Sequence, residues 1–570
     1  MSLYADNVTI FLPYREIYLR ESIEILENFY RLSGLQLQRK KTQVCVFGKI
    51  PVGNLRLCRD IDLNWSQEFE LLGIKFNGDL TNLGDNIGKK LNEIDRIIAN
   101  WKYRFLSPLG KAVIVKSLLL SKINHIAFII PTITSSLIKR IEDKLFDFIW
   151  GGRDLVARKD AKKPENKGGL NLPDINSSWC AFKLSWLRRL ENGSTTWGKI
   201  FADSLTLIDQ ELTVENLLYN TGTVKLGKII RKLNNPFWSE VIRCYKPALT
   251  NLLETYPEYI LYTPIWDSHA ILANNNSCSK RTYNTLSRDI GFISDLMQHK
   301  NGTFCFMSHD EMENRVNHAI DVNQYISLRE VTRQAMRKIN FNYALHIPVN
   351  PICPIGKILI NLCQKGCNKW AQLFKNNCNK SIVQCEQNWE TALGSRQGVH
   401  FWDRNYSNVR NIFFDNRIKL FYYYIVRGTL KTNRIVHNHV RNITNACTYC
   451  NDDIETIIHL FWECNITSDF ITRLRQLINR ISPDSFRTPT CKQFIFGFSD
   501  EQIYSKDNIL NLYIKRYIWK MKFANCILNI NSFIKWLSFE WELNLNAFSN
   551  DVRLNYLLPI LDSIKLHLQQ

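Results

Sequence analysis

Four potential metal ligands in the last third of the chain constrain its folding more than any other feature. They have the spacing C-x2-C-x8-H-x4-C and are Cys447, Cys450, His459 and Cys464. A C-x2-C pair forms a tight turn that directs two thiolates at one point, and a second pair that includes an imidazole completes a tetrahedral zinc site. Four protein ligands leave no open coordination position, so we expect a structural Zn²⁺.

The residues around these ligands predict a small folded module. A short helix over residues 454–461 would carry His459 back over the turn. Two upstream histidines, His437 and His439, are alternatives to His459 as ligand. A competing interpretation is a cysteine-rich loop that lies near a core histidine by chance, because the spacing is typical of zinc sites without being diagnostic. The expected core residues are Ile457, Ile458, Leu460, Phe461 and Trp462.

The chain is strongly basic, with a formal net charge of +20 over 570 residues. Such an excess favours a polyanionic partner, either nucleic acid or an acidic membrane surface. Residues 85–200 contain 21 lysines and arginines against 11 aspartates and glutamates, so this fifth of the chain carries half of the excess. For a single lysine a solvated helical face is the simpler interpretation, whereas the clustering favours phosphate binding.

Nothing in the sequence favours a membrane. The longest apolar run, around residues 123–133, is too short and too polar to span a bilayer. The first residues, MSLYADN, lack the basic start and apolar stretch of a signal peptide. The 16 cysteines are therefore expected to be reduced thiols and metal ligands, which predicts a nuclear or cytoplasmic location.

Hydrophobic periodicity predicts a mainly α, multidomain protein that begins with a small α+β region. Short strands and one helix, over residues 17–32, are expected in residues 1–84. Residues 85–190 read as a helical basic segment and 191–400 as a helical connector. Residues 401–480 combine basic and aromatic residues with the four-ligand module, and 481–570 form a helical tail. The basic and aromatic residues of 401–441 fit either base stacking or a packed helix with a basic outer face.

Six blocks of sequence follow one another between residues 4 and 464. They are YADN at 4–7, SGLQL with KKT at 33–42, FELLGIKF at 69–76, WKYRFLSPLGKAVIVKSLLLSK at 101–122, FIW at 148–150 with GGLNLPD at 168–174, and the four-ligand array ending in IHLFWEC at 458–464. In this order they resemble the [YF]-x-D-D turn, the SGL-x-x-N-x-x-KT segment, the primer-gripping hairpin, the thumb, the FIW…GGL-x-x-P-D segment and the zinc-binding module of LINE-type (non-LTR) retrotransposon reverse transcriptases.

The resemblance implies a palm remnant, a thumb and a zinc module that bind template RNA and primer DNA. The family transfers nucleotides with two Mg²⁺ ions, which need carboxylates from two palm segments. Asp6 matches the first aspartate of the catalytic turn, but Asn7 replaces the second, and an amide has no charge to offset a metal ion. The other palm aspartate lies upstream of the matching turn in the family. Candidate nucleic-acid-binding residues are Lys41, Arg104, Lys111, Lys116, Lys122, Arg417 and Lys419.

Three functions agree with these features. The first is a truncated LINE-type reverse transcriptase that binds RNA and DNA but does not polymerise alone, with Zn²⁺ as its structural metal. The second is an active RNA-directed DNA polymerase, which would use Mg²⁺ once upstream palm and fingers are supplied. The third is a non-enzymatic, zinc-containing nucleic-acid-binding protein. The degenerate turn at Asp6 favours the first.

Overall fold

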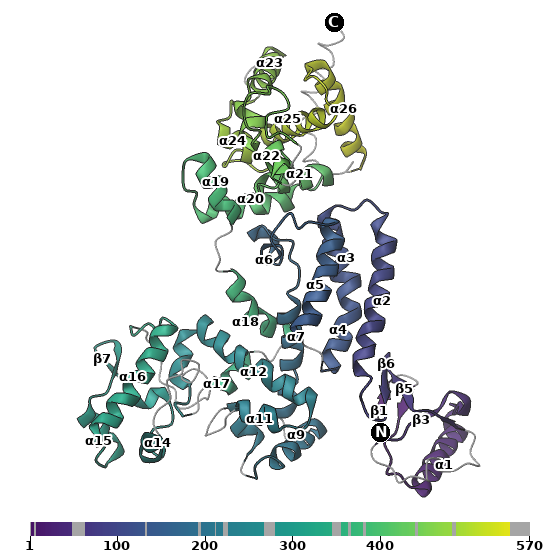
Figure 1. Cartoon of the computed structure of the whole chain (residues 1–570), viewed down its shortest axis with the longest axis vertical. Helices are drawn as coiled ribbons and strands as arrows, with labels where there is room; N and C mark the ends of the chain where they lie inside the picture. Colours follow the sequence, from purple (N-terminus) through teal and green to yellow (C-terminus); the bar gives the residue numbers. More distant parts are fainter. Residues whose placement is uncertain are drawn as a thin grey trace. The chain divides into compact units, whose positions relative to one another are not determined.

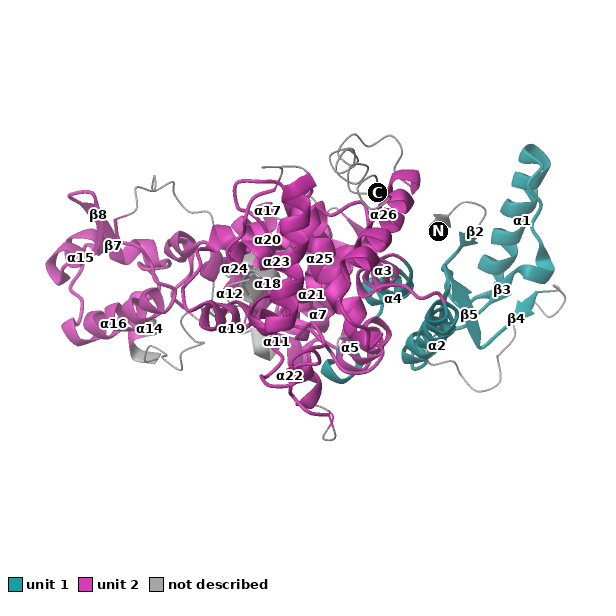
Figure 2. Ribbon diagram, turned by 90° about the horizontal axis from the view of Figure 1, so that it is seen from above, with its two compact units in different colours: residues 1–103, 118–137 teal, residues 104–117, 138–570 magenta. Residues whose placement is uncertain are grey.

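The computed structural model describes residues 2–4, 7–47, 63–131, 134–191, 195–210, 212–219, 226–266, 280–344, 355–362, 366–379, 384–438, 440, 443–481 and 486–547. The chain divides into two compact units (Figure 2). Unit 1 contains residues 1–103 and 118–137, and unit 2 contains residues 104–117 and 138–570. The fold is mostly helical with a few short strands, which confirms the predicted fold class. The five segments drawn from the sequence stay a prediction.

Unit 1 contains the small α+β region. Its elements are β1 (Ser2–Tyr4), β2 (Asn7–Thr9), α1 (Glu16–Ser33), η1 (Arg39–Lys41), β3 (Gln43–Val44), β4 (Asn64–Trp65), β5 (Glu68–Leu71), β6 (Ile74–Asn77), α2 (Leu83–Lys102) and α4 (Leu120–Ile129). Strands pair as two-stranded sheets, antiparallel for β1–β2 and β5–β6 and parallel for β3–β4. The helix predicted for residues 17–32 is confirmed as α1. It is capped by Gly34, the next residue, whose φ of 75° suits a residue without Cβ.

The β5–β6 hairpin is fixed to helix α2 by one buried asparagine. Leu72 and Gly73 have φ values of 50° and 78° and close the turn between the strands. Asn86 accepts a hydrogen bond from the Lys75 amide at 2.8 Å and donates one to the Lys75 carbonyl, also at 2.8 Å. Helix α2 then packs along α4 through an apolar face that includes Leu91 and Ile94.

Unit 2 is almost entirely helical (Figure 1). Its first half contains α3 (Pro108–Ile114), η2 (Val115–Leu119, shared with unit 1), α5 (Ser135–Trp150, likewise shared), α6 (Arg158–Ala161), η3 (Glu165–Lys167), α7 (Ile175–Leu184), α8 (Leu187–Glu191), α9 (Thr196–Thr206), α10 (Val214–Tyr219), α11 (Leu226–Lys232), α12 (Pro236–Thr255) and η4 (Pro257–Tyr262). The elements that follow are α14 (Lys280–Leu286), η5 (Ile293–Leu296), β7 (Met297–Lys300), β8 (Thr303–Phe306), α15 (His309–Val316), α16 (Val322–Lys338), α17 (Ile355–Leu362) and α18 (Cys367–Asn379).

The remaining elements of unit 2 surround the four potential metal ligands. They are α19 (Gln384–Leu393), α20 (Val399–Asn411), α21 (Asn416–Val426), α22 (Asn433–His437), η6 (His459–Glu463), α23 (Asn465–Ile481), α24 (Cys491–Phe496), α25 (Lys506–Phe523) and α26 (Ile530–Ala547). Helix α21 packs against both α20 and α25, and α24 packs against η6 and α25. The segment with the ligands and the helical tail after it therefore share a core.

The GGLNLPD block has a structural reason for its residues. A Cβ on Gly169 would lie 1.9 Å from the carbonyl oxygen of Lys163, so no other residue fits there. Asp174 caps the start of α7 by accepting a hydrogen bond from the Ser177 amide at 2.8 Å. The same carboxylate pairs with Lys162 at 2.5 Å. The block thus closes a tight loop and starts a helix.

One sequence expectation about membranes needs correction. Residues Pro108–Ile129 form a helical stretch of 22 residues, long and apolar enough by length and composition to cross a bilayer. The apolar run expected from the sequence covers only residues 123–133, whereas the helical stretch starts earlier and remains apolar on average although it contains Lys111, Lys116 and Lys122. Core helices of soluble proteins pass the same test, so this stretch is a weak indication and carries no membrane assignment.

Candidate metal centre

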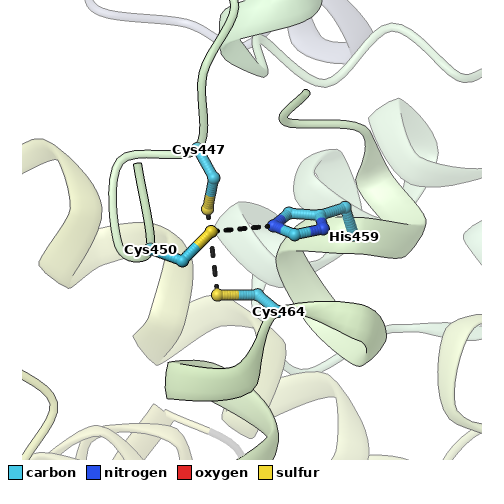
Figure 3. Close-up of side chains that lie close together, drawn as sticks. All are labelled: Cys447, Cys450, His459 and Cys464. Atoms are coloured by element: carbon cyan, nitrogen blue, oxygen red, sulfur yellow. Dashed lines mark hydrogen bonds between the residues drawn. The ribbon is translucent and has the colours of Figure 1, made fainter. Parts of the chain in front are cut away.

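The four predicted ligands converge on one point in unit 2 (Figure 3). Their ligand atoms all lie within 4.8 Å of one another. Cys447 and Cys464 are fully buried, His459 is 4% exposed and Cys450 is half-buried. Residues separated by up to 17 positions therefore present three sulfur atoms and one imidazole nitrogen to a shared centre.

Two of the distances between these atoms match the edges of a zinc tetrahedron. Zn–S bonds of about 2.3 Å and Zn–N bonds of about 2.0–2.1 Å give edges of about 3.8 Å between sulfurs and about 3.5 Å between sulfur and nitrogen. The Sγ atoms of Cys447 and Cys464 lie 3.9 Å apart. The Sγ of Cys450 and the Nε2 of His459 lie 3.4 Å apart. Both distances fit a shared Zn²⁺, and three thiolates with one imidazole are ligands typical of a structural site.

The backbone holds the C-x2-C pair in a closed turn. The Cys447 amide donates to the Asp453 carbonyl at 2.8 Å, and the Asn451 amide donates to the Cys447 carbonyl at 3.0 Å. Asn451 has a φ of 60°, a left-handed conformation that asparagine tolerates better than most residues. A bridge between Ala446 and Ile454 closes the base of the loop. These backbone bonds therefore place the two thiols on the same side of the turn.

The second pair of ligands is carried by a short helix that begins later than predicted. Ile454 pairs with Ala446 instead of entering the helix, so the helical residues are 457–463. The His459 amide donates to the Thr456 hydroxyl at 2.9 Å, and the Cys464 amide donates to the His459 carbonyl at 2.8 Å. The predicted core is confirmed for Ile457, Ile458, Leu460 and Phe461, which are buried, and Trp462 is half-buried.

The two cysteines of the turn differ in acidity. Burial raises the pKa of the Cys447 thiol to about 12. Burial also raises the pKa of Cys450, but hydrogen bonds from the amides of Asp453 and Asp452 outweigh it and bring the value to about 7. Cys450 is thus the thiol most ready to lose its proton, and Zn²⁺ would have to displace the proton of Cys447.

The alternative histidine ligands are not part of the cluster in the residues that the structure describes. His437 is exposed, and its Nδ1 lies 2.6 Å from the Ile443 carbonyl oxygen. His439 lies outside the described residues. Asp453 lies 3.8 Å from Nδ1 of His459, on the side of the ring away from Cys450, where it favours Nε2 as the ligand atom.

A second group of potential ligands, His309, Asp310 and Glu313, gathers at the start of α15. His309 Nε2 lies 2.8 Å from the Ile320 carbonyl oxygen, and Glu313 accepts the Ile320 amide at 2.8 Å. Two of the three side chains therefore hold the loop that follows α15, which is sufficient reason for their proximity.

The candidate nucleic-acid-binding residues of unit 1 are exposed. Lys41 lies in η1, and Lys122 in α4 lies 3.8 Å from Glu93. Asp6, the candidate catalytic residue, lies outside the described residues. The structure places the flanking β1 and β2 as an antiparallel hairpin with Tyr4 opposite Asn7, the arrangement expected around a two-residue turn.

The candidates of unit 2 differ in their exposure, and the charge of Arg417 is balanced within the chain. Arg104 is exposed, whereas Lys111 and Lys116 are half-buried, and Lys111 lies over the Phe148 ring at 5.4 Å. Arg417 forms ion pairs with Asp415 and Glu540, so much of its charge is balanced within the chain. Burial lowers the pKa of Lys419, which lies half-buried on α21.

The aromatic residues of 401–441 belong mainly to the core. Trp402, Tyr406, Phe414, Phe421, Tyr422 and Tyr423 are all buried. Arg427, counted in the sequence as part of the basic surface, is 4% exposed and pairs with the equally buried Asp160 at 3.0 Å. The packed-helix interpretation therefore holds for these residues, and base stacking by them is not supported.

The Asp160–Arg427 pair is an important contact that the sequence did not reveal. Lys163 lies 3.1 Å from the other oxygen of Asp160, so two buried cations share one buried carboxylate. The pair connects residues 267 positions apart and fixes helix α6, which contains Asp160, to the C-terminal end of helix α21, where Arg427 is the capping residue. No local spacing signals such a contact; the sequence shows only a charged residue directly after the apolar run that ends α21.

Comparison with known proteins supports the resemblance drawn from the motifs. A family model described as zinc-binding in reverse transcriptase matches residues 384–470, which include all four ligands. The "Transposon TX1 uncharacterized 149 kDa protein" of Xenopus laevis is 24% identical over 192 residues. That alignment covers 33% of this chain and 14% of the relative, so the chain matches only about a seventh of that protein's length. These two matches confirm the resemblance to a reverse-transcriptase zinc-binding module and to a transposon protein.

Proposed function

We propose that this chain is a nucleic-acid-binding part of a LINE-type reverse transcriptase and that it does not polymerise by itself. The observation that carries the proposal is the Cys447–Cys450–His459–Cys464 cluster, which has zinc geometry inside the segment that matches the reverse-transcriptase zinc-binding family. A closed site of four protein ligands has no position for substrate, so its Zn²⁺ holds the fold together. The metal would organise a binding surface and would not take part in chemistry.

RNA and DNA are the proposed partners, as template and primer. The net charge of +20 supports a polyanion, and half of it falls in residues 85–200. Exposed cations such as Lys41 and Arg104 support contacts to phosphates. A nuclear or cytoplasmic location is proposed with these partners, because both compartments contain RNA and keep thiols reduced.

The absence of independent polymerisation is proposed from the chemistry of the turn at residues 4–7. Two-metal nucleotidyl transfer needs several carboxylates to balance two divalent cations. At the matching positions this chain offers Asp6 followed by Asn7, whose amide oxygen carries no formal charge. Mg²⁺ would become relevant only if further carboxylates were supplied by polypeptide outside this chain.

Salt-dependent binding tests the nucleic-acid part of the proposal. The affinity for an RNA–DNA hybrid should fall steeply and linearly with salt on logarithmic axes, because phosphate contacts release condensed counterions. A triple variant with Lys111, Lys116 and Lys122 changed to Gln should bind more weakly and with a shallower salt slope. The slope should decrease by about 2–3, given one released counterion for each lost phosphate contact.

A matched control uses three exposed lysines of the helical connector. Lys232, Lys246 and Lys369 lie on α11, α12 and α18 and are also changed to Gln. This control removes the same net charge, so it should affect non-specific attraction equally. Equal losses in the two triple variants would show that binding is spread over the whole surface, and binding that does not respond to salt would contradict the proposal.

A further inference from the structure

A buried glutamate lies between the two halves of the metal cluster. Glu455 follows the C-x2-C turn, precedes His459 and is 0% exposed. Its carboxylate accepts hydrogen bonds from both the amide and the hydroxyl of Thr448, each at 2.9 Å, and from the Asn433 amide at 2.8 Å. Thr448 is one of the two residues enclosed by Cys447 and Cys450. Glu455 therefore holds the centre of the turn that aims two of the four ligands.

The charge of Glu455 is balanced by a residue far along the chain. Lys522, near the end of α25, forms a direct ion pair with the Glu455 carboxylate and is itself buried. The other residue inside the turn, Tyr449, donates its hydroxyl to the Ile518 carbonyl of α25 at 2.7 Å. Both residues between the paired cysteines are thus held by α25, one directly and one through Glu455.

We propose that Glu455 and Lys522 are positioning residues of the zinc site, so that zinc affinity depends on helix α25. The inference rests on zinc binding by the four-ligand cluster. It extends the site beyond the segment matched by the family model, which ends at residue 470, to a helix that begins at residue 506. Residues behind metal ligands commonly contribute about 10–100-fold to metal affinity because they fix the direction of each ligand.

The physical reason is the state of Glu455 without Lys522. A buried carboxylate that loses the cation paired with it either takes up a proton or draws water into the turn. Either change weakens its hold on the Thr448 amide and hydroxyl, and the turn can then open. Because Cys447 and Cys450 lie on either side of that turn, their sulfur atoms would no longer be fixed at the separation that a tetrahedral ion needs.

The test measures zinc affinity of the full chain by competition with a metallochromic chelator. Parent protein is compared with Lys522→Met and Glu455→Gln, and the same proteins loaded with Co²⁺ report tetrahedral geometry through their visible absorption. We expect about a 10-fold or larger loss of zinc affinity in each single variant. In the double variant Glu455→Gln/Lys522→Met the losses should be much less than additive, because the two residues act as one pair.

A second buried pair provides the matched control. Lys183 on α7 and Glu240 on α12 lie 3.1 Å apart and are 0% and 7% exposed, and neither helix carries a ligand. Lys183→Met should destabilise the protein in the same way as Lys522→Met but leave zinc affinity within about twofold of the parent. If zinc affinity fell only because the protein is less stable, it would fall equally in Lys183→Met and Lys522→Met. A difference in zinc affinity between these two variants therefore reports positioning of the ligands.

The outcomes separate this inference from zinc binding itself. If the parent binds no zinc, the cluster is not a metal site and the proposed function loses its main support. If the parent binds zinc and Lys522→Met binds it equally well, α25 does not position the site and this inference is wrong. If Lys522→Met does not fold, Tyr449→Phe decides, because it removes only the contact to Ile518. A loss of zinc affinity in Tyr449→Phe, smaller than the loss of about 10-fold expected for Lys522→Met, supports the inference. An unchanged zinc affinity in Tyr449→Phe overturns it.

Discussion

Removal of Arg427 should loosen the contact between helix α6, together with the loop that follows it, and the zinc-binding segment. Arg427 and Asp160 are each 4% exposed and lie 3.0 Å apart, so Arg427→Met leaves a carboxylate in a site that excludes water. Breaking a buried ion pair from one side costs about 3–5 kcal/mol. Lys163 stays 3.1 Å from the same carboxylate, so we expect the lower end, about 3 kcal/mol.

The assay for this prediction is amide hydrogen exchange followed by mass spectrometry. Leu170 donates its amide to Ala161 and Asn171 donates to Lys163, so these amides report opening of the loop. A loss of about 3 kcal/mol corresponds to roughly a 100-fold faster exchange for them, since each 1.36 kcal/mol is a factor of ten. Arg473→Met removes an exposed pair with Asp469 and serves as the control, expected to change stability by at most about 0.5 kcal/mol.

The same pair predicts a pH dependence. Burial raises the pKa of Asp160, but the hydrogen bond and charge of Arg427 outweigh it and hold the pKa below its usual range. The stabilising contribution is therefore present above the unfolded pKa of about 3.9 and is lost as the pH falls through the folded value. Arg427→Met should lose less stability on acidification than the parent. Unchanged exchange in the variant, together with an unchanged acid response, would show that the Asp160–Arg427 pair does not hold this contact closed.

Two further predictions concern single side chains of the zinc-binding segment and the tail. Elemental analysis of the purified protein should find about one Zn²⁺ per chain. Cys447→Ser should abolish this zinc, and Cys491→Ser, which lies outside the cluster, should leave it unchanged. An equal zinc content in all three proteins would exclude the site. Burial lowers the pKa of Lys515 to about 7, while the unfolded chain keeps its proton up to about pH 10.4. Stability should therefore rise between about pH 7 and pH 10 in the parent, and Lys515→Met should flatten that rise in denaturant unfolding; parallel curves would show that Lys515 titrates normally.

The metal cluster could be predicted from the sequence because its information is local. A C-x2-C turn and a histidine on the following helix are set by short-range backbone geometry, so Cys447, Cys450, His459 and Cys464 were identified by spacing alone. The start of the helix was misplaced because Ile454 pairs across the turn with Ala446, and an apolar residue reads the same in a bridge as in a helix. Helix α1 and its cap at Gly34 could also be predicted, because apolar periodicity and a glycine after the helix are local features.

Contacts between distant segments could not be predicted in this way. Arg427 and Arg417 looked like surface cations, but their partners Asp160 and Glu540 lie 267 and 123 residues away. The aromatic residues 421–423 have a composition that suits either stacking on bases or packing in a core, and only the positions of α20 and α25 decide for the core. The ion pair of Lys522 could not be predicted either, because its partner Glu455 lies in a distant segment of the chain.

The most direct test of the account is primer extension on an RNA template with Mg²⁺ or Mn²⁺, measured beside binding of the same template–primer. Parent protein and Asp6→Ala are compared under identical conditions. We expect both proteins to bind the template–primer and neither to extend it. Extension by the parent that Asp6→Ala abolishes would show that a second carboxylate of this chain completes a two-metal site, and it would contradict the central claim.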